Sequence, residues 1–404
     1  MTLSILQIAN KGINPPDGGT MAITLLTREL ARRGNQVTLF TLTTEKHNNP
    51  NIFPASLQKN IQLLSVPVAT KPSAIKILSH ILSSRKDPFM AKRFYHPSVK
   101  KTLIHLLQTN HFDIIQLEGP FMGLYLPILQ KYSTAPIILR AHNLEYRIWQ
   151  LKAQRARGVK KGIYKFISEE LKNFEEHLFL KCQGILPITP VDAKEIAMIA
   201  PQVPQMILPY CTDNTPKQII KKTGGVNRVG YLGALDWQPN IEGLYWFIEK
   251  VWHLLLLENP EITLQVAGRN ASRQLRRDLS KTKGVEFAGE IPDAEAFLSQ
   301  QSVLVVPLWS GSGIRVKIIE GMSLGLPMVA TSMALKGIEA THGKQLLIAD
   351  TPENFAKRTN SLLSNPKQAE SLGKQAQEFV HQQFNQEKWF PELIRFYKNI
   401  ASHD

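Results

Sequence analysis

Short apolar strands alternate with helical segments along the first half of the chain, and this alternation constrains the fold more than any other feature. The segment 18–34 has helical periodicity and ends at Gly34, a typical stop residue. Repeated strand–helix–strand units predict a parallel, doubly wound sheet. Each expected strand is short, apolar and followed by a helical pattern: 3–9, 36–42, 113–117, 136–141 and 184–189.

The alternation restarts after a polar stretch, 212–223, which is followed by two glycines. A helix is expected at 241–256, and the helical tail is expected to break near Pro391. The strands expected in this half are 228–235, 262–268, 285–289, 303–308 and 327–331.

Two alternating halves predict an α/β protein with two Rossmann-like, doubly wound domains facing a central cleft. A chain of 404 residues is also too long for one ordinary core. The expected parts are an N-terminal domain (1–211), a linker (212–225), a C-terminal domain (226–380) and a C-terminal helix (381–404) that packs back on the first domain.

The chain has no run of 18 apolar residues, so no membrane-spanning helix is expected. Its first residues, "MTLSILQIA", lack the charged start and cleavage site of a signal peptide. Two cysteines cannot form a disulfide framework. These features predict a cytoplasmic protein, in solution or peripheral on the inner face of the membrane.

The formal net charge is +15, which suits nucleic acid, an anionic membrane or a phosphorylated small molecule. The stretch 71–101 holds eight Lys or Arg against one acid, Asp87, and the stretch 150–165 holds six and no acid. Both mix cations with apolar residues, a pattern typical of a membrane-surface patch. Solvated helix faces are the alternative.

The stretch "SGSGIRVKIIEGMSLGLPMVAT", 310–331, places Arg315 and Lys317 after a glycine-serine turn, where a helix is expected to begin near Ile314. Each cation there is disfavoured by about 0.3–1 kcal/mol, unless an anion such as a phosphate binds at the turn. Glu320 follows one turn later, and its carboxylate suits the two vicinal hydroxyls of a ribose. Ile314 is expected to pack inward with Ile318 and Met322. A surface Lys–Glu pair is the alternative.

Two glycine turns precede other helices. Gly18 and Gly19 follow the first strand, where a plain connection and an anion site are both open. Gly233 lies in "YLGALDWQPNIEG", 231–243, and lets a diphosphate approach the backbone. In the same stretch Asn240 is expected to cap a helix that begins at Ile241. Asp236 there fits ordinary capping and packing nearly as well as ligand binding.

His142 stands at the end of a predicted strand, in "LRAHNLEYRIW", and Glu145 follows three residues later. A neutral imidazole at that place binds a sugar hydroxyl or moves a proton. A core histidine is the alternative. No matched His or Cys cluster is evident, so no metal site is expected.

Taken in order, these motifs resemble the group 1 (family 4) retaining glycosyltransferases of the GT-B fold. The likeness covers nearly the whole chain and is strongest in 311–331, with the branch acting on bacterial cell-surface polysaccharides suggested by 139–149. The motifs that carry it are "PPDGGTMAITLLTREL", "LRAHNLEYRIW", "GYLGALDWQPN", "LQVAGR", "VEFAGEI", "VLVVPL" and "GSGIRVKIIEGMSLGLPMVAT".

The resemblance implies roles for these residues. Glu320 matches a glutamate that holds the donor ribose, Lys317 a cation near the diphosphate, and His142 a histidine near the transferred sugar; these three are the expected catalytic residues. The family often has a second glutamate eight residues before the one matched by Glu320, and Ser312 occupies that position in this sequence. His142 and Glu145 are expected on the acceptor side. The expected donor-binding residues are Gly18, Gly19, Gly233, Asp236, Asn240, Arg269, Glu290, Gly313, Ile314, Arg315, Lys317 and Glu320.

The implied reaction moves a hexosyl unit from a UDP- or GDP-sugar to a hydroxyl of a glycan or a lipid-linked acceptor, with retention of configuration. No cofactor beyond the nucleotide sugar is expected, and the Asp-x-Asp triplet of metal-dependent glycosyltransferases is absent from the sequence. Three alternatives stay open: a nucleotide-sugar epimerase of similar fold, a basic nucleic-acid-binding protein, and an inactive regulatory binder. No helix-turn-helix, RNP signature or zinc module is present, so sequence-specific nucleic acid is not an expected partner.

Overall fold

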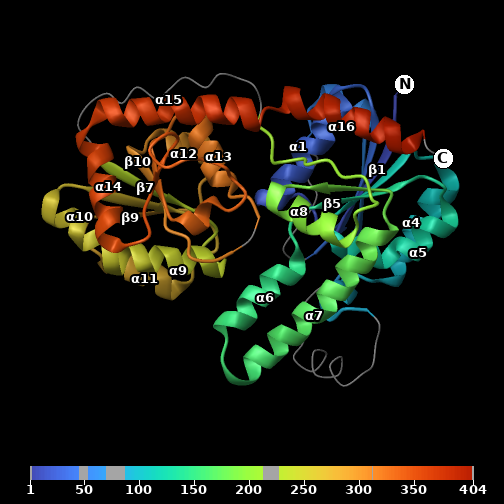
Figure 1. Ribbon diagram of the computed structural model, residues 1–404, viewed down its shortest axis with the longest axis horizontal. Coiled ribbons are helices and arrows are strands. Elements are labelled where there is room, and N and C mark those ends of the chain that lie inside the picture. The colour runs from blue at the N-terminus through green and yellow to red at the C-terminus, as the bar shows by residue number, and fades with distance from the viewer. Residues whose placement is uncertain (1, 45–52, 70–86, 213–226, 312, 403–404) are drawn as a thin grey trace. The chain divides into compact units, whose positions relative to one another are not determined.

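The chain folds into two compact units, Met1–Cys211 with Lys388–Asp404 (unit 1) and Thr212–Glu387 (unit 2). The computed structural model, drawn in Figure 1, describes residues 2–44, 53–69, 87–212, 227–311 and 313–402. The expected linker, 212–225, therefore lies outside the described residues apart from Thr212. Of the first basic stretch, only residues 87–101 are described.

Unit 1 is built on a six-stranded parallel sheet of order β3-β2-β1-β4-β5-β6. This is the strand order of a Rossmann fold. Its central strands are apolar runs buried on both faces, as a parallel sheet covered by helices requires. The strands are β1 (Ser4–Ala9), β2 (Gln36–Thr43), β3 (Ile61–Pro67), β4 (Ile114–Glu118), β5 (Ile137–Ala141) and β6 (Gly184–Pro187).

Helices cover both faces of this sheet. After α1 the chain turns at Gly34, whose φ of +86° confirms the expected stop. The helices α6 and α7 lie side by side as an antiparallel hairpin that extends away from the sheet (Figure 1). The helical segments of unit 1 are α1 (Gly18–Arg32), η1 (Ala55–Asn60), α3 (Phe89–Lys92), α4 (Pro97–Thr109), η2 (Pro120–Tyr125), α5 (Leu126–Tyr132), α6 (Glu145–Arg155), α7 (Gly158–Lys181) and α8 (Pro190–Ile199), with most of α16 (Gln386–Ala401).

Unit 2 repeats the same topology, with a parallel sheet of order β12-β11-β10-β7-β8-β9. The strands are β7 (Arg228–Leu232), β8 (Thr263–Ala267), β9 (Val285–Gly289), β10 (Val303–Val306), β11 (Met328–Ala330) and β12 (Leu347–Ile348). The helical segments are α9 (Gln238–Trp246), η3 (Phe247–Trp252), α10 (His253–Glu258), α11 (Arg273–Lys281), α12 (Ala294–Ser299), α13 (Val316–Ser323), η4 (Ser332–Leu335), α14 (Pro352–Ser364) and α15 (Pro366–Gln383).

The two Rossmann-like sheets confirm the expected fold class. Each expected strand is present, β9 with the expected bounds and the others with ends shifted. Two edge strands, β3 and β12, were not expected. β3 is half-exposed, so it lacks the continuous apolar run of the central strands, and β12 has only two residues. Unit 2 also contains a π-helical segment, η3, where one regular helix was expected.

The expected break at Pro391 is wrong, because α16 continues through that proline. The chain breaks instead between α15 and α16, near Phe384. The apolar face of α16, with Phe390, Leu393 and Tyr397, is buried against unit 1 residues such as Leu3 and Leu30. Burial of several large side chains outweighs the single backbone hydrogen bond that a proline removes.

Candidate active site

In unit 2 the strand order reverses between β7 and β10. The chain runs from β7 outward to β8 and β9, and then crosses to β10 on the other side of β7. Ligands of open α/β sheets bind at the carboxyl ends of the strands at such a reversal point. Gly233 directly follows β7, and the segment that contains Arg315 and Lys317 follows β10. The sequence-predicted phosphate residues therefore meet at the reversal point.

Lys317 connects the two sides of this point. Its Nζ donates to the carbonyl oxygen of Leu232, the last residue of β7, and to Asn240 Oδ1 at 3.0 Å. Asn240 Nδ2 in turn donates to the carbonyl oxygen of Ala234 at 2.9 Å. A Cβ atom at Gly233 would lie 2.7 Å from Lys317 Nζ and 2.6 Å from Asn240 Nδ2, so a larger residue there would displace both of these groups.

The two cations of the motif lie close together, with Arg315 buried and Lys317 partly buried. Burial lowers the pKa of Lys317 to about 7, and the charge of Arg315 adds to this effect. Burial also lowers the pKa of Arg315 to about 10. Arg315 Nη1 donates to the carbonyl oxygen of Gly313 at 2.8 Å, and its guanidinium lies 5.6 Å from the ring centroid of Trp237. An anion bound here would restore the charge of Lys317 and offset the repulsion between the two cations.

Two details of the expected geometry are wrong. The helix α13 begins at Val316, so Ile314 lies before it and is partly exposed, whereas Ile318 and Met322 are buried. The helix α9 begins at Gln238 with Trp237 as its N-cap, so Asn240 lies inside the helix and does not cap it. Pro239 in the first turn explains the earlier start, because its fixed φ suits that position. The side chain of Asn240 is instead held by Lys317 and Ala234.

The other predicted donor residues follow neighbouring strands at the same edge of the sheet. Arg269 follows β8, and its carbonyl oxygen accepts from Leu235 N at 2.8 Å. Asp236 is exposed, and its Oδ2 accepts from Asn270 Nδ2 at 3.1 Å. Glu290 is exposed after the outermost strand, β9.

Glu320 lies on α13, one turn after Lys317, and is partly buried. Ser312, which stands where the family has a second glutamate, lies outside the described residues.

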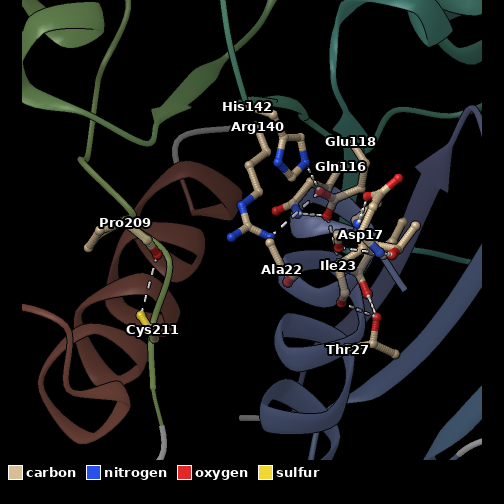
Figure 2. Close-up of polar contacts among 12 residues, drawn as sticks. Asp17, Ala22, Ile23, Thr27, Gln116, Glu118, Arg140, His142, Pro209 and Cys211 are labelled. Carbon is tan, nitrogen blue, oxygen red and sulfur yellow. Dashed lines mark hydrogen bonds and ion pairs between the residues drawn. The ribbon is translucent and has the colours of Figure 1, made fainter. Parts of the chain in front are cut away.

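Unit 1 has a polar cluster at its own reversal point, between β1 and β4 (Figure 2). His142 directly follows β5, and its Nε2 lies 2.7 Å from Oε2 of Glu118, the last residue of β4. Glu118 Oε1 accepts from Gln7 Nε2 at 3.0 Å and from Gln116 Nε2 at 2.5 Å. Arg140 Nη1 lies 3.7 Å from Glu118 Oε2 and donates to the carbonyl oxygen of Ala22 at 3.1 Å.

The protonation of this cluster follows from its surroundings. Burial acts to raise the pKa of Glu118, but the charge of Arg140 and the hydrogen bonds from His142 and Gln116 lower it overall. Burial, with the charge of Arg140, lowers the pKa of His142 although Glu118 opposes this. At neutral pH a neutral imidazole therefore faces a carboxylate, and Nε2–H donates a hydrogen bond to that carboxylate. His142 Nδ1 then holds the lone pair and accepts hydrogen bonds.

The remaining predicted residues of unit 1 lie on two helix N-termini. Gly18 and Gly19 open α1, where Asp17 is the N-cap and its carboxylate accepts from Thr20 N at 2.9 Å. Lys11 lies 2.6 Å from the same carboxylate. The helix end at these glycines thus already carries an internal anion and its counter-cation.

Glu145 opens α6, and its backbone nitrogen donates to Glu175 Oε1 at 3.0 Å. Burial raises the pKa of Glu145 to about 7, against the charges of Lys152, Lys11 and Arg93.

Glu118, Arg140 and Lys11 belong to the site but were not predicted from the sequence. The sequence does contain a signal for Glu118. It is the last residue of the apolar strand β4, and His142 likewise comes directly after the apolar strand β5. Polar residues at the carboxyl ends of adjacent parallel strands lie together. Within the described residues, no group of three or more His, Cys, Asp or Glu side chains has a metal-binding arrangement.

Comparison with known families agrees with this geometry. Residues 16–196 match the family model "Glycosyltransferase Family 4", and residues 226–365 match the model "Glycosyl transferases group 1". Together the two models match more than half of the chain, one in each unit. The chain belongs to the family 4, group 1 glycosyltransferases. The recognition made from the sequence motifs is thereby confirmed, and both Rossmann-like units of this glycosyltransferase carry family motifs.

Individual relatives are distant. An uncharacterized 44.6 kDa protein in the cps region of Klebsiella pneumoniae is 25% identical over 173 residues, which are 41% of this chain; the match spans 44% of the length of that curated relative. Sucrose-phosphate synthase from Thermosynechococcus elongatus is 16% identical, with a TM-score of 0.75 and 100% of both chains covered. HepE from Anabaena, solved in complex with UDP-glucose, is 13% identical, with a TM-score of 0.63 and 99% of both chains covered. These structural matches establish the GT-B fold of the glycosyltransferase.

Proposed function

We propose that the protein transfers a hexosyl unit from a nucleoside diphosphate sugar, a UDP-sugar in the first place, to a hydroxyl group of a glycan or lipid-linked acceptor. The observation that carries this proposal is the partly buried Lys317, held at the strand reversal of unit 2 and packed closely against Gly233. HepE, which has the same fold, was solved with UDP-glucose. A GDP-sugar is the second candidate donor.

Cleavage of the anomeric carbon–oxygen bond leaves negative charge on the departing diphosphate. In this proposal Lys317, Arg315 and the N-terminal end of α13 stabilise that charge. The pKa of Lys317, about 7 without ligand, rises when a diphosphate binds, so the side chain is fully charged during bond cleavage. Glu320, one turn further along α13, binds the ribose hydroxyls, while Arg269 and Glu290 lie in loops that contact the base.

In this mechanism His142 binds the transferred sugar. Its neutral ring donates from Nε2 to Glu118 and offers Nδ1 to a sugar hydroxyl. Because Glu118 is fully buried and engaged by Gln7, Gln116 and His142, it acts through the histidine and does not serve as a nucleophile. Retention of configuration is then best achieved by attack on the same face of the sugar, assisted by the leaving phosphate.

Transfer is proposed to need no metal, since two cations already face the diphosphate position. Lys317 and Arg315 supply, as fixed charges, the stabilisation that a divalent ion supplies in metal-dependent transferases. Adding EDTA to a transfer assay would leave the rate unchanged under this proposal, and a loss of activity restored by Mg²⁺ or Mn²⁺ would contradict it.

In this proposal the α6–α7 hairpin binds an anionic membrane surface, and the protein meets its acceptor there. Between residues 150 and 165 the hairpin has no acid and six cations, of which Lys165 pairs with Glu169 at 3.8 Å: Lys152, Arg155, Arg157, Lys160, Lys161 and Lys165. Val159, at the start of α7, is 81% exposed among them, and Trp149 packs edge-on against Tyr164 at 5.5 Å. The two aromatic residues are partly buried, so Val159 is the exposed apolar group of the three. An exposed apolar residue among cations favours the headgroup region of a bilayer. In the described part of the chain, no helix has both the length and the apolar character needed to cross a membrane.

Two assays in sequence test the proposal. A thermal-shift panel of nucleoside diphosphates and their sugars identifies the donor by the largest rise in Tm. Transfer from that donor to glycan and lipid-linked acceptors then confirms the reaction. Conversion of the free donor without an acceptor would indicate an epimerase instead. A sequence-dependent gel shift on nucleic acid that persists at 200 mM salt would also contradict the proposal.

A further inference from the structure

A chain of hydrogen bonds runs from the C-terminal helix of unit 1 to His142. The hydroxyl of Tyr397, on α16, donates to Gln116 Oε1 on β4. Gln116 Nε2 donates to Glu118 Oε1 at 2.5 Å, and Glu118 Oε2 accepts from His142 Nε2 at 2.7 Å. Tyr397 and Gln116 are fully buried, and Glu118 is 2% exposed. Water is thus kept from the first three members of the chain.

The amide of Gln116 has only one orientation that satisfies both neighbours. A tyrosine hydroxyl donates to the amide oxygen, so the amide nitrogen is turned toward the carboxylate of Glu118. Burial and the charge of Glu118 both raise the pKa of Tyr397, so its hydroxyl keeps its proton at physiological pH. Without that hydroxyl the amide loses the donor that fixes its oxygen, so its direction toward Glu118 is less restricted.

A second series of hydrogen bonds, which begins at α1, reaches the same oxygen of Glu118, Oε1. The hydroxyl of Thr27, on α1, lies 2.7 Å from Gln7 Oε1, and Gln7 Nε2 donates to Glu118 Oε1 at 3.0 Å. Both glutamines therefore donate to Oε1, while Oε2 accepts from His142 and lies 3.7 Å from Arg140 Nη1. With one oxygen fixed by two amides, the plane of the carboxylate and the direction of its bond to His142 are fixed as well.

We propose that Tyr397 is a positioning residue of this glycosyltransferase, which orients His142 through Gln116 and Glu118. The inference rests on the proposed function of His142 for its kinetic consequence, although the hydrogen bonds themselves do not. It gives the C-terminal helix a role in the chemistry of unit 1 in addition to covering its core.

The kinetic test compares Tyr397→Phe with Tyr125→Phe. Tyr125 is a matched control, because it is also fully buried in unit 1 and its hydroxyl donates to the carbonyl oxygen of Phe94, away from Glu118. We expect Tyr397→Phe to lower kcat about tenfold, the effect of one buried hydrogen bond, with the KM for the donor unchanged. Tyr125→Phe should leave kcat unchanged. An equal kcat in Tyr397→Phe and wild type would overturn the proposal.

A double-mutant cycle separates positioning from general damage to the fold. In a His142→Ala background, Tyr397→Phe should have no further effect on kcat, because the residue through which it acts is gone. A further tenfold fall in that background would show a purely structural role and would overturn the proposal. Thermal unfolding of each variant accompanies the cycle to show that the protein is folded.

The tautomer of His142 can be measured without substrate, so the positioning role of Tyr397 can be tested independently of the proposed transfer reaction. Histidine-selective ¹⁵N labelling reports the tautomer of His142, with its signals assigned by their loss in His142→Gln. Wild type should show a single form protonated at Nε2, and Tyr397→Phe should show a mixture of tautomers. Unchanged His142 signals in Tyr397→Phe would overturn the positioning role. If wild type transfers no sugar but the signals change as expected, the proposed function fails and the positioning role stands.

Discussion

Lys317 Nζ donates a hydrogen bond to the carbonyl oxygen of Leu232 and so joins the first turn of α13 to the last residue of β7. The bond spans 85 residues of sequence and crosses the strand reversal of unit 2. A lysine that is partly buried, next to a second cation and beside a closely packed glycine, is costly unless it serves a ligand. The predictions for unit 2 follow from this arrangement.

Lys317→Met should weaken the binding of UDP about 10- to 100-fold, since a charge-assisted hydrogen bond to phosphate is lost. Isothermal titration calorimetry measures the change. Lys344→Met is the matched control, because Lys344 is an exposed lysine of the same unit. Equal affinity of Lys317→Met and wild type would contradict the assignment of Lys317 to the diphosphate.

The affinity for UDP should fall as pH rises above about 7. Burial and Arg315 hold the pKa of Lys317 at about 7 in the free protein, and a diphosphate raises it. The ligand therefore binds the protonated lysine, and binding takes up a proton between the two pKa values. Affinity should fall by up to about tenfold per pH unit in that range. The fall should vanish in Lys317→Met; a slope that survives in this variant would mean that another group is responsible.

Gly233→Ala should abolish donor binding and also cost about 1–3 kcal/mol of stability, because the new methyl group overlaps Lys317 and Asn240. Chemical denaturation and thermal-shift response to UDP measure the two effects. Gly162→Ala serves as the control, since a Cβ there meets nothing within 4 Å. Normal UDP binding by Gly233→Ala would show that this glycine does not shape the site.

Glu118→Gln should lower kcat about 100-fold, as expected when a general acid–base group loses its partner. It should also change the acid stability of the protein. The pKa of Glu118 is lowered in the folded state, so its ionisation stabilises the fold at neutral pH, and this contribution disappears as pH falls through the folded-state value. Denaturation between pH 3 and 7 should therefore show a weaker pH dependence in Glu118→Gln. If the free energy of unfolding of Glu118→Gln depended on pH as steeply as that of wild type, the folded state would not lower the pKa of Glu118.

Reversing two charges on the hairpin, Lys160→Glu with Lys161→Glu, should reduce binding to vesicles that contain anionic lipid, by about 1 kcal/mol for each lysine lost from the surface. Vesicle co-sedimentation at low and high salt measures the effect. Lys281→Glu with Lys283→Glu is the control, because it makes the same change of charge on exposed residues of unit 2. If both double variants lose binding equally, net charge and not the hairpin is responsible.

The sequence predicted what local pattern determines. The strands β1, β4 and β10 are short apolar runs, and Gly34 stops α1 by its own conformation, so each is visible within a few residues. The early start of α9 was visible too, since Pro239 is a first-turn signal.

What the sequence did not predict depends on partners far apart in the chain. Asn240 was assigned to a local cap, but its side chain is held by Lys317, 77 residues away. Glu118 reaches His142 across 24 residues, and Tyr397 reaches Gln116 across 281. These contacts follow from the strand order, in which β4 lies between β1 and β5, and from the return of α16 to unit 1. The hydrophobic periodicity of the sequence contains no information on these long-range contacts.

The most direct test is a crystal structure of the protein soaked with UDP. The account predicts difference density for the diphosphate in contact with Lys317 Nζ and the backbone of Gly233, with the ribose hydroxyls at Glu320. Density for UDP at another place, with the corner between β7 and β10 closed by protein atoms, would contradict it.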